Sequence, residues 1–189
     1  VTPSDPKALN SVALTVKLKG SPKAVSITDG VLDLDNSKIT FTANAQEFEK
    51  PKLSFELKVD TIDVDRYLPP EQEEKAISEK KAISSEAKKT NNEPLRRMGL
   101  DGKVQIGKLQ VKKAKVKDLE MKIPASKGLF QLDPFALSIY EGSVNGKAIY
   151  DVRKDTPKQT ANINAKGIQI NPLLKDMFQK DFLEGYFLT

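Results

Sequence analysis

Cysteine and histidine are absent from the sequence of 189 residues. Their absence excludes disulfides, thiolate nucleophiles, zinc sites built from cysteine or histidine, and catalytic triads that use a histidine base. No apolar run approaches the roughly 18 to 20 residues that a membrane-spanning helix needs, and no signal peptide is recognisable. Because the chain opens without a methionine and closes within an apolar run, we expect it to be an excerpt of a longer protein.

Motifs that would indicate an enzyme are also missing. The sequence contains no glycine loop for cradling phosphate, no nucleophile elbow and no redox motif. Asp33 and Asp35 lie two residues apart, as do Asp63 and Asp65, and each pair shares a strand face, a spacing that an acid–base pair could use. A solvated strand face explains both pairs more simply, and neither lies in a loop with the glycine and terminal glutamate of an EF-hand. We therefore expect no enzymatic activity, no cofactor and no metal site.

The charge of the chain gives little indication of a partner. Lysine and arginine number 31 against 26 aspartates and glutamates, a net charge of +5, and the lysines are spread over many segments. Between Lys103 and Lys122 they alternate with apolar residues, and such a basic strand face could contact anionic headgroups or nucleic acid, or simply be solvated. Aromatic residues for base stacking are not interleaved with these lysines, so we expect no nucleic-acid partner.

Alternation of apolar and polar residues is what the sequence contains in abundance. From residue 11 to residue 20, and in several later segments, apolar side chains recur at every second position, which is the pattern of a half-buried strand. Turn signals at residues 29–30, 140–142 and 145–146 lie between such segments. The pattern predicts a mainly β protein with minor α, in which a twisted antiparallel sheet with short helices curls into a groove or half-barrel.

The apolar faces of these strands are the candidate ligand site. A sheet that curls around its apolar side forms a groove for apolar ligands, whereas a sheet whose apolar side is covered by a helix forms an ordinary core, and both interpretations fit the pattern. The groove candidates are Val12, Leu14, Val16, Leu18, Ile39, Phe41, Leu53, Phe55, Leu57, Val104, Ile106, Leu109, Val111, Phe135, Leu137 and Ile139.

Two segments depart from the strand pattern. Residues 71–94 are mostly lysine, glutamate, serine and alanine, so they cannot bury enough apolar area to offset their ordering entropy, and we expect a mobile charged linker or, alternatively, a polar helix. Near the end, apolar residues at three- and four-residue spacing predict a helix from Pro172 to Glu184 with Asn171 as its N-cap. A shorter helix is expected near Arg66, with Asp65 as its cap.

A weak duplication relates the two halves of the chain. Residues 30–35 align with residues 128–133, and residues 62–68 align with residues 168–174. In both copies strand alternation ends in an aspartate or asparagine that is followed by a helical turn, which favours a repeat of strands plus one short helix. We therefore divide the chain into a first β-unit at residues 1–70, the linker at 71–94, and a second β-unit with the C-terminal helix at 95–189.

Five short motifs follow one another in a fixed order along the chain: DVDRYLP at residues 63–69, LDGKVQIGKL at 100–109, LSIYEGSVNG at 137–146, GIQINPLLKD at 167–176 and FLEG at 182–185. Each motif is mostly structural glycines and apolar positions, so their order and spacing are more specific than any one of them. In this order they resemble the C-terminal region of the AsmA family, and the resemblance covers most of the chain. The charged segment falls where members of the family vary.

The resemblance implies a location and a function. AsmA-like proteins are anchored in the inner membrane of Gram-negative bacteria, and their large periplasmic parts are linked to outer-membrane assembly and lipid homeostasis. They are similar to the chorein-type bridge proteins, which carry lipid along an apolar groove. By this resemblance we expect a periplasmic, non-enzymatic module that shelters phospholipid or another apolar ligand on an apolar sheet face, and such a module should co-purify with phospholipid.

Two other functions stay open. The chain could be a structural module that pairs through its sheet edges with envelope proteins, or with neighbouring repeats of the full-length chain, and such a module should capture partners without lipid. A hydrolase that uses the carboxylate pairs is the third interpretation, and it would require Asp63 or Asp65 for turnover.

Overall fold

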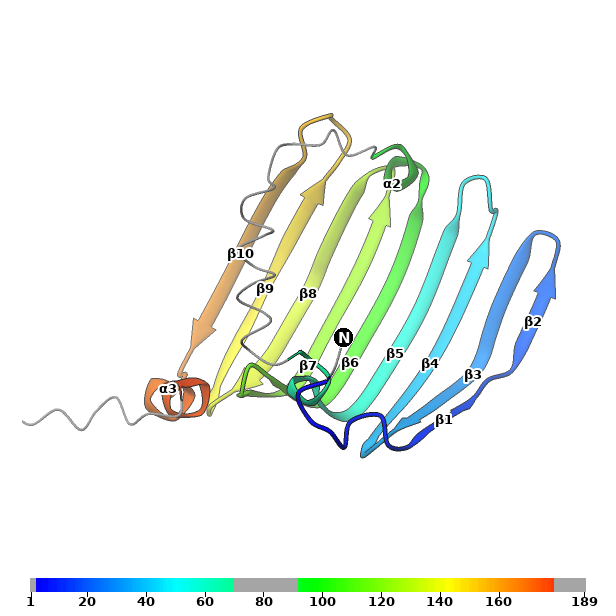
Figure 1. Cartoon of the computed structure of the whole chain (residues 1–189). Helices are drawn as coiled ribbons and strands as arrows, with labels where there is room; N and C mark the ends of the chain where they lie inside the picture. Colours follow the sequence, from blue (N-terminus) through cyan, green and yellow to red (C-terminus); the bar gives the residue numbers. More distant parts are fainter. Residues whose placement is uncertain (1–2, 70–91, 179–189) are drawn as a thin grey trace, which may run out of the picture.

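The described part of the chain forms one large sheet of ten strands, and its helical segments lie at the strand ends (Figure 1). The structure is a computed structural model, and it describes residues 3–69 and 92–178. The strands are β1 Val12–Thr15, β2 Leu18–Ser21, β3 Ala24–Leu34, β4 Ser37–Gln46, β5 Lys52–Asp63, β6 Gly99–Val111, β7 Ala114–Ser126, β8 Leu129–Ile139, β9 Gly142–Asp151 and β10 Lys158–Lys166; the helical segments are η1 Val64–Arg66, α2 Glu93–Arg97 and α3 Ile170–Phe178.

Neighbouring strands follow each other along the chain, in the order β1-β3-β4-β5-β6-β7-β8-β9-β10, and β2 also pairs with β3. The prediction of a mainly β fold with one curled sheet is therefore confirmed. The sheet is mixed rather than wholly antiparallel, however, because β5 and β6 run parallel, with Lys52 opposite Gly99 and Asp63 opposite Gln110. This parallel pair corrects the prediction of an antiparallel sheet.

The parallel pair has a physical reason in the connection between its strands. Two parallel neighbours need a connection of about a dozen residues or more that returns the chain to the end where the first strand started. Residues 64–98 make this connection, and they include the segment predicted as a charged linker. Residues 71–91 of this predicted linker lie outside the described residues, whereas Glu93 and Pro94 begin α2.

The first predicted strand is divided in two. Residues 11–20 alternate as one strand, yet the structure forms β1 and β2, both paired with β3, and leaves Val16 in the break between them. The break lies opposite a register irregularity of β3 between Ile27 and Gly30. A straight strand cannot pair continuously with an irregular partner, so residues 11–20 are interrupted. The cause lies in β3, and the alternation of residues 11–20 alone could not show it.

Three hairpin turns consist of two residues that both adopt positive φ. Such turns match the twist of the flanking strands, and they normally contain glycine or asparagine. The turn predicted at residues 140–142 is confirmed, but the signals at 29–30 and 145–146 are wrong, because these residues lie within β3 and β9. A Cβ at Gly146 would collide with the carbonyl oxygen of Asn162 in β10, so this glycine permits a close approach of strands rather than a turn. The three turns are Lys112-Lys113, Lys127-Gly128 and Tyr140-Glu141.

The Lys112-Lys113 turn lacks the usual turn residues, and a carboxylate compensates. φ is 48° at Lys112 and 64° at Lys113. Both backbone N–H groups donate to the carboxylate of Asp65, that of Lys113 at 2.7 Å. Hydrogen bonds to a charged group are among the stronger ones in proteins, so Asp65 holds a turn that its own residues disfavour.

Replacing Lys112 by Asn and Lys113 by Gly is expected to stabilise the protein, because these residues adopt positive φ at little steric cost. We expect the free energy of unfolding to rise by about 1 kcal/mol, which corresponds to about 2–4 °C in Tm for a chain of this size. Thermal unfolding measures the change. Lys117→Gly, in the interior of β7, is the control and should lower Tm; a double variant that also lowers Tm would contradict this interpretation of the turn.

Both predicted helix caps are misplaced, although the short helix near Arg66 is confirmed as η1. Asp63 is the N-cap of η1, and its carboxylate accepts the N–H of Asp65 at 3.1 Å, while Asp65 lies inside the helix. α3 begins at Ile170, so Asn171 lies in its first turn rather than before it. The predicted helical residues after 178 lie outside the described residues.

The two halves of the sheet end in the same way. β3, β4 and β5 lead into η1, and β8, β9 and β10 lead into α3, with η1 and α3 at the same end of the strands (Figure 1). Residues 62–68 and 168–174 therefore occupy equivalent places. Residues 30–35 and 128–133 do not, because the first set precedes a hairpin turn whereas the second follows one, and this part of the predicted alignment is wrong.

A tyrosine–aspartate pair fastens each helical segment to a hairpin. In the first half the hydroxyl of Tyr67 donates to Asp35, in the β3–β4 turn, at 2.9 Å. In the second half the hydroxyl of Tyr140, in the β8–β9 turn, donates to Asp176 of α3 at 2.8 Å. The tyrosine and the aspartate have thus exchanged places between turn and helical segment.

The first pair predicts how stability depends on pH. The pKa of Asp35 is lowered most by the hydrogen bond from the Ser11 backbone and less by the one from the Tyr67 hydroxyl. The stability that Asp35 contributes is therefore present above its unfolded-state pKa of about 3.9 and is lost as pH falls through the lower folded-state value. Burial, followed by the bond to Asp35, raises the pKa of Tyr67. The stability from Tyr67 is therefore lost as pH rises from about 10 through the raised value.

We expect Tyr67→Phe to reduce the alkaline decline in stability, and Asp35→Asn to reduce the acid decline. Asparagine tolerates the positive φ of 52° at position 35, so this variant changes the charge with little backbone strain. Midpoints of urea unfolding across pH measure both effects. Tyr150→Phe is the control, because no hydrogen bond joins the Tyr150 hydroxyl to a carboxylate in the described part of the chain. A wild-type alkaline profile in Tyr67→Phe would refute the assignment.

Candidate functional site

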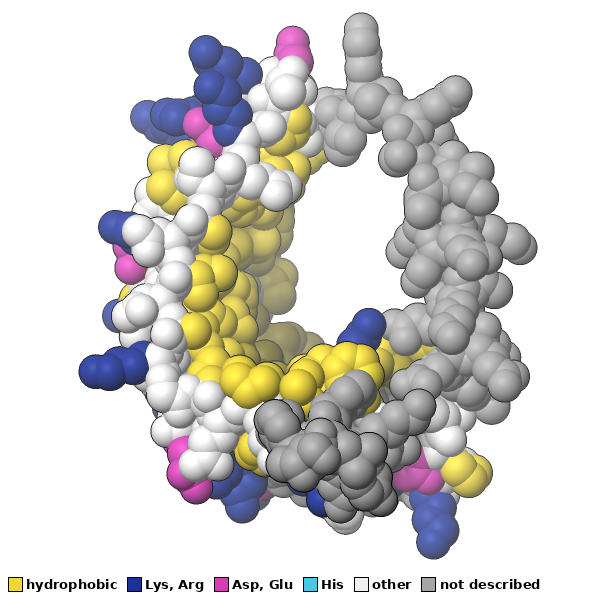
Figure 2. Space-filling view, turned by 90° about the vertical axis from the view of Figure 1, so that its left-hand side faces the viewer, with side chains coloured by type: hydrophobic (Ala, Val, Ile, Leu, Met, Phe, Trp, Pro, Cys, Tyr) yellow, Lys and Arg dark blue, Asp and Glu magenta, His cyan; other side chains and the backbone are white. Residues whose placement is uncertain are grey.

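One face of the sheet is apolar nearly from edge to edge. Opposite positions on neighbouring strands point to the same side, so apolar partners in register form rows that run across the strands. Figure 2 shows the result: hydrophobic side chains line the inner surface of the curved sheet. We call the hollowed space along this face the trough. One row contains Phe41, Leu57, Val104, Met121 and Phe135, and another contains Leu14, Leu32, Ile39, Val59, Ile106 and Leu119.

The opposite face, called the outer face below, is polar. Glu56 lies opposite Lys103, with 3.8 Å between Nζ and Oε1, and Gln105 donates to Glu120 at 3.4 Å. Of the lysines predicted as a basic strand face, those within β6 and β7 lie here, with Lys103 directly opposite Lys122, whereas Lys112 and Lys113 form the turn between the two strands. Exposed ion pairs contribute little to stability, so the outer face is chiefly the side that keeps the sheet hydrated.

No described helix lies across the apolar face. η1 and α3 contact β6 and β7, and all described helical segments sit at strand ends (Figure 1). Only central residues such as Val59 and Leu119 are buried, at 7% and 6% exposure, whereas Leu14 in β1 is 61% exposed and Ile163 in β10 is 63% exposed. A contiguous apolar surface that stays exposed toward its edges is typical of a binding surface.

The described residues line a hollow toward each side of the apolar face. The larger, which we call the β10-side hollow, has a volume of about 610 Å³. The smaller, which we call the β2-side hollow, has a volume of about 290 Å³. The larger volume lies in the range of about 300 to 1,000 Å³ that is usual for ligand sites. Apolar residues that line the larger hollow are Met121, Ile123, Phe130, Leu132, Ala148, Ile149, Tyr150 and Ala161; those that line the smaller are Val25, Ile27, Ala43, Ala45, Leu53, Phe55 and Leu100.

Two phenylalanine rings lie against glycines on the floor of the trough. Phe41 is opposite Gly30, and a Cβ on Gly30 would be 2.5 Å from Cε2 of Phe41. Phe55 is opposite Gly102, and a Cβ on Gly102 would be 2.6 Å from Cζ of Phe55. Each ring therefore occupies the space that a side chain on the neighbouring strand would fill. The glycines let two large rings lie low on the sheet instead of projecting into the trough.

The structure brings the predicted groove residues together on this face, with the exception of Val16. Phe41, Leu57 and Val104 lie side by side in one row, and Leu109 lies opposite Val116 in a row that continues to Ile139 in β8. Val16 is half-buried in the break between β1 and β2 and belongs to no described strand. The other predicted groove residues lie in the strands that form the apolar face.

Sequence reasoning missed the residues that make the larger hollow. Phe130 and Tyr150 lie opposite each other, with ring centroids 6.4 Å apart, and Ala148 lies between Leu132 and Ala161. The inward positions of β9 and β10 at the hollow include Ala148 and Ala161, small residues that the alternation does not emphasise. Those small side chains leave the space that larger ones would have filled. The alternation of Ala161 with polar residues was the available signal.

Three of the four paired carboxylates, those of Asp35, Asp63 and Asp65, hold backbone N–H groups. Asp35 accepts the N–H groups of Leu9, Asn10 and Ser11, and Asp65 holds the Lys112-Lys113 turn. Asp63 caps η1. Within residues 3–69 and 92–178, no group of three or more acidic side chains is placed to hold a metal ion. None of the described helices is long and apolar enough to cross a bilayer.

Together these features define a mostly β protein whose single open sheet has one apolar, hollowed face. The chain belongs to the AsmA family, whose family model matches residues 3–187. This match confirms the resemblance carried by the sequence motifs. Neither a curated protein nor a solved structure matches the chain. Membership of the family is consistent with a role related to the cell envelope or to lipids.

Proposed function

We propose that this chain is a non-enzymatic module that shelters phospholipid acyl chains against the apolar face of its sheet. The observation that carries the proposal is the series of apolar rows that reaches exposed residues at both edges, Leu14 in β1 and Ile163 in β10. A closed core would bury such side chains, whereas a surface for acyl chains keeps them accessible until a ligand covers them.

The energetics favour an acyl chain as the occupant. Each buried CH₂ group contributes about 0.8 kcal/mol, so an acyl segment of about ten CH₂ groups gains on the order of 8 kcal/mol before the cost of its ordering. This attraction is not directional, and it therefore needs neither polar contacts nor a closed pocket. The rings of Phe41 and Phe55 lie low over Gly30 and Gly102, and this leaves room for an acyl chain to lie across several strands.

The cellular setting belongs to the same proposal and is supported by the family. We infer a periplasmic module of a protein anchored in the inner membrane of a Gram-negative bacterium, with a role in outer-membrane biogenesis or lipid homeostasis. Acyl chains that pass between membranes must avoid water, and a trough that is open at the sheet edges provides an apolar path over its own length.

Mass spectrometry of solvent extracts from the purified protein tests the proposal. We expect phospholipid to co-purify, and we expect delipidated protein to take up labelled phospholipid from solution. Protein that carries no lipid after purification, and that takes up none after delipidation, would overturn the proposed function.

A second candidate, a scaffold that binds through its sheet edges, is favoured by one observation. Every residue of β10 is exposed, and among the described strands β10 pairs only with β9. An unpaired strand edge can accept a strand from an envelope protein or from a neighbouring repeat. On this alternative Asn164→Pro should abolish partner capture while lipid uptake stays unchanged, and Asn164→Ala should affect neither.

A further inference from the structure

The β10-side hollow opens toward a rim on which three segments converge. Phe130 is the second residue of β8 and Tyr150 is the last but one of β9, so the hollow reaches the ends of these strands. A Cβ on Gly128, in the β7–β8 turn, would be 3.2 Å from Cγ of Arg96 in α2 and 3.4 Å from Cγ of Arg153 in the β9–β10 loop. α2, the turn and the loop therefore form one continuous surface above the hollow, which we call the β10-side rim.

Contacts within the rim hold it in place. Nε of Arg96 donates to the carbonyl oxygen of Val152 at 2.8 Å, and Val152 is fully buried. The N–H of Val152 donates to the carbonyl of Gly128 at 2.8 Å. These bonds join α2, the β7–β8 turn and the β9–β10 loop, so the charges of the rim are presented from a defined backbone.

The rim has a surplus of positive charge. Six cationic side chains and three carboxylates leave three positive charges without an acidic counterpart in the rim. The carboxylates pair with arginines: Arg96 with Glu93 at 3.1 Å and with Asp155 at 3.0 Å, and Arg153 with Asp151 at 2.6 Å. The six cations are Arg96, Arg97, Lys127, Arg153, Lys154 and Lys158.

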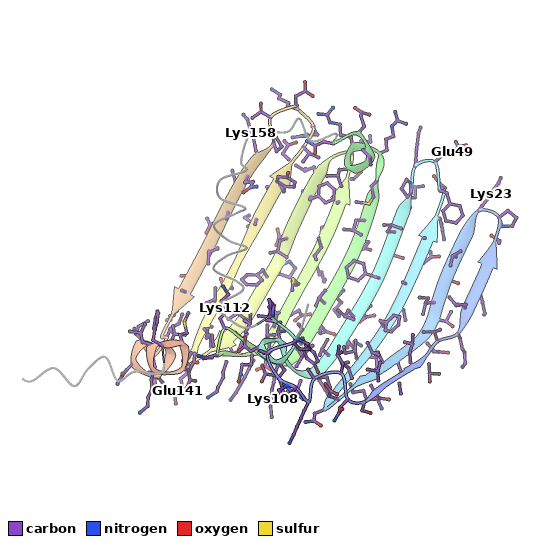
Figure 3. The ribbon with its side chains drawn as sticks, in the orientation of Figure 1. Lys23, Glu49, Lys108, Lys112, Glu141 and Lys158 are labelled. Carbon is purple, nitrogen blue, oxygen red and sulfur yellow. The ribbon has the colours of Figure 1, made fainter. Side chains whose placement is uncertain are left out.

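Three lysines account for the surplus. Lys127, Lys154 and Lys158 are exposed, and in the described part of the chain none of them forms an ion pair. Figure 2, viewed from the β10 side, shows basic side chains gathered at the top of the sheet above the apolar inner wall. Figure 3 shows Lys158 where the β9–β10 loop enters β10.

The turns above the β2-side hollow, at the same strand ends as the rim, carry less net charge. Above the β2-side hollow the turns contain Lys23 and Lys50 together with Glu47 and Glu49. Lys52, the first residue of β5, pairs with Glu47 at 2.8 Å. Figure 3 labels Lys23 and Glu49 on two turns at this end of the strands, and the backbone N–H of Glu47 donates to the carbonyl oxygen of Lys23 at 3.1 Å. A surplus of one positive charge remains here against three on the β10-side rim, and the larger charge stands above the larger hollow.

We propose that the β10-side rim binds the phosphate of an anionic glycerophospholipid whose acyl chains occupy the hollow beneath it. This inference rests on the proposed function and adds to it a headgroup site, a preferred ligand charge and an orientation. Lysine ammonium groups bind phosphate as point charges, and they favour a lipid with a net negative charge over a zwitterionic one. Tyr150, which is apolar along its ring and polar at its hydroxyl, lies at the boundary where chain and headgroup meet.

Binding of two soluble short-chain lipids tests the proposal. Dioctanoyl phosphatidylglycerol is anionic and dioctanoyl phosphatidylcholine is zwitterionic, and both are titrated below their micelle concentrations by calorimetry. We expect the wild-type protein to bind the anionic lipid about tenfold more tightly at low salt, with a difference that shrinks as salt rises. The triple variant K127Q/K154Q/K158Q should lose this preference and retain its affinity for phosphatidylcholine.

The matched control K19Q/K23Q/K50Q removes the same charge at the other end of the sheet and should keep the preference, because these exposed lysines lie away from the β10-side rim. Equal affinities for both lipids in the wild-type protein, or a preference that survives in the rim variant, would overturn the headgroup site and leave the proposed function standing. Failure to bind either lipid would overturn the proposed function itself. Competition by inorganic phosphate as effective as that by the lipid, or binding only to anionic vesicles, would show a phosphate or membrane surface instead and would also overturn the inference.

Discussion

Ala148→Glu is expected to reduce lipid binding by at least about tenfold while leaving the fold intact. Ala148 lies between Leu132 and Ala161 and faces the β10-side hollow. A carboxylate in the hollow must either lose its water when an acyl chain enters, at a cost of several kcal/mol, or keep that water and exclude the chain. Tenfold corresponds to only 1.4 kcal/mol, so the expected loss is a lower bound. In the absence of lipid the glutamate can extend to water, and we expect the free energy of unfolding to change by less than about 1 kcal/mol.

Asn145→Glu is the matched control for this variant. Asn145 is in the same strand but lies opposite Ala136 and Asn164 on the outer face, so the substitution adds the same charge on the other side of the sheet. Uptake of labelled phospholipid by the two variants, compared at equal protein concentration, separates a general effect of charge from an effect at the apolar face. Equal uptake by both variants would place the lipid elsewhere than in the hollow.

Gly102→Ala is expected to destabilise the protein by about 1–3 kcal/mol, although alanine normally stabilises a strand relative to glycine. The added Cβ would lie 2.6 Å from Cζ of Phe55, so the ring must leave the floor and enter the trough. The displaced ring would also take space from the β2-side hollow, which Phe55 lines, and lipid uptake should fall together with stability.

Two further variants make this prediction specific. Gly20→Ala places a Cβ where no atom lies within 4 Å, and we expect its free energy of unfolding to be unchanged or slightly raised. Phe55→Leu combined with Gly102→Ala should recover part of the loss, with a coupling energy of at least about 0.5 kcal/mol in the double-mutant cycle. Additive effects of the two substitutions would contradict the contact between ring and glycine.

Much of the sheet could be predicted from alternation. Most strands have one hydrated and one apolar face, so their sequences alternate between polar and apolar residues. Leu53 to Val59 and Phe135 to Ile139 behaved in this way. The parallel pairing of β5 and β6 could not be predicted, because it depends on where the chain returns after residues 64–98 and not on the composition of either strand. The split at Val16 likewise depends on an irregularity in the partner strand.

Turns and caps were predicted less well, because distant groups decide them. The Lys112-Lys113 turn contains no turn-forming residue and is held by a carboxylate far away in the sequence, that of Asp65. The same bond explains why Asp65 is not a cap. Gly146 looked like a turn residue, yet its lack of a side chain is required by the approach of Asn162 in β10.

The candidate site was predictable as a face and not as a shape. Alternation identifies which side chains share a face, so Phe41, Leu57 and Val104 could be expected together. The hollows depend on where large and small residues meet across strands, as with Ala148 beside Leu132, and on rings that lie over glycines. Which side chains meet in this way depends on the register between neighbouring strands, and the sequence of one strand does not reveal that register. The charge surplus of the β10-side rim has the same origin, because α2 and two hairpin ends contribute to it.

The position of a bound acyl chain on the protein is the decisive measurement. Phospholipid with a photoreactive group in its acyl chain can be bound, cross-linked and mapped by peptide mass spectrometry, and the absence of cysteine allows single labels to be added for confirmation. We predict adducts on residues of the apolar face, foremost Met121, Phe130 and Leu132 in the β10-side hollow. Adducts confined to the outer face, for example at Lys103 and Lys122, or no adducts above background, would contradict a trough that shelters acyl chains.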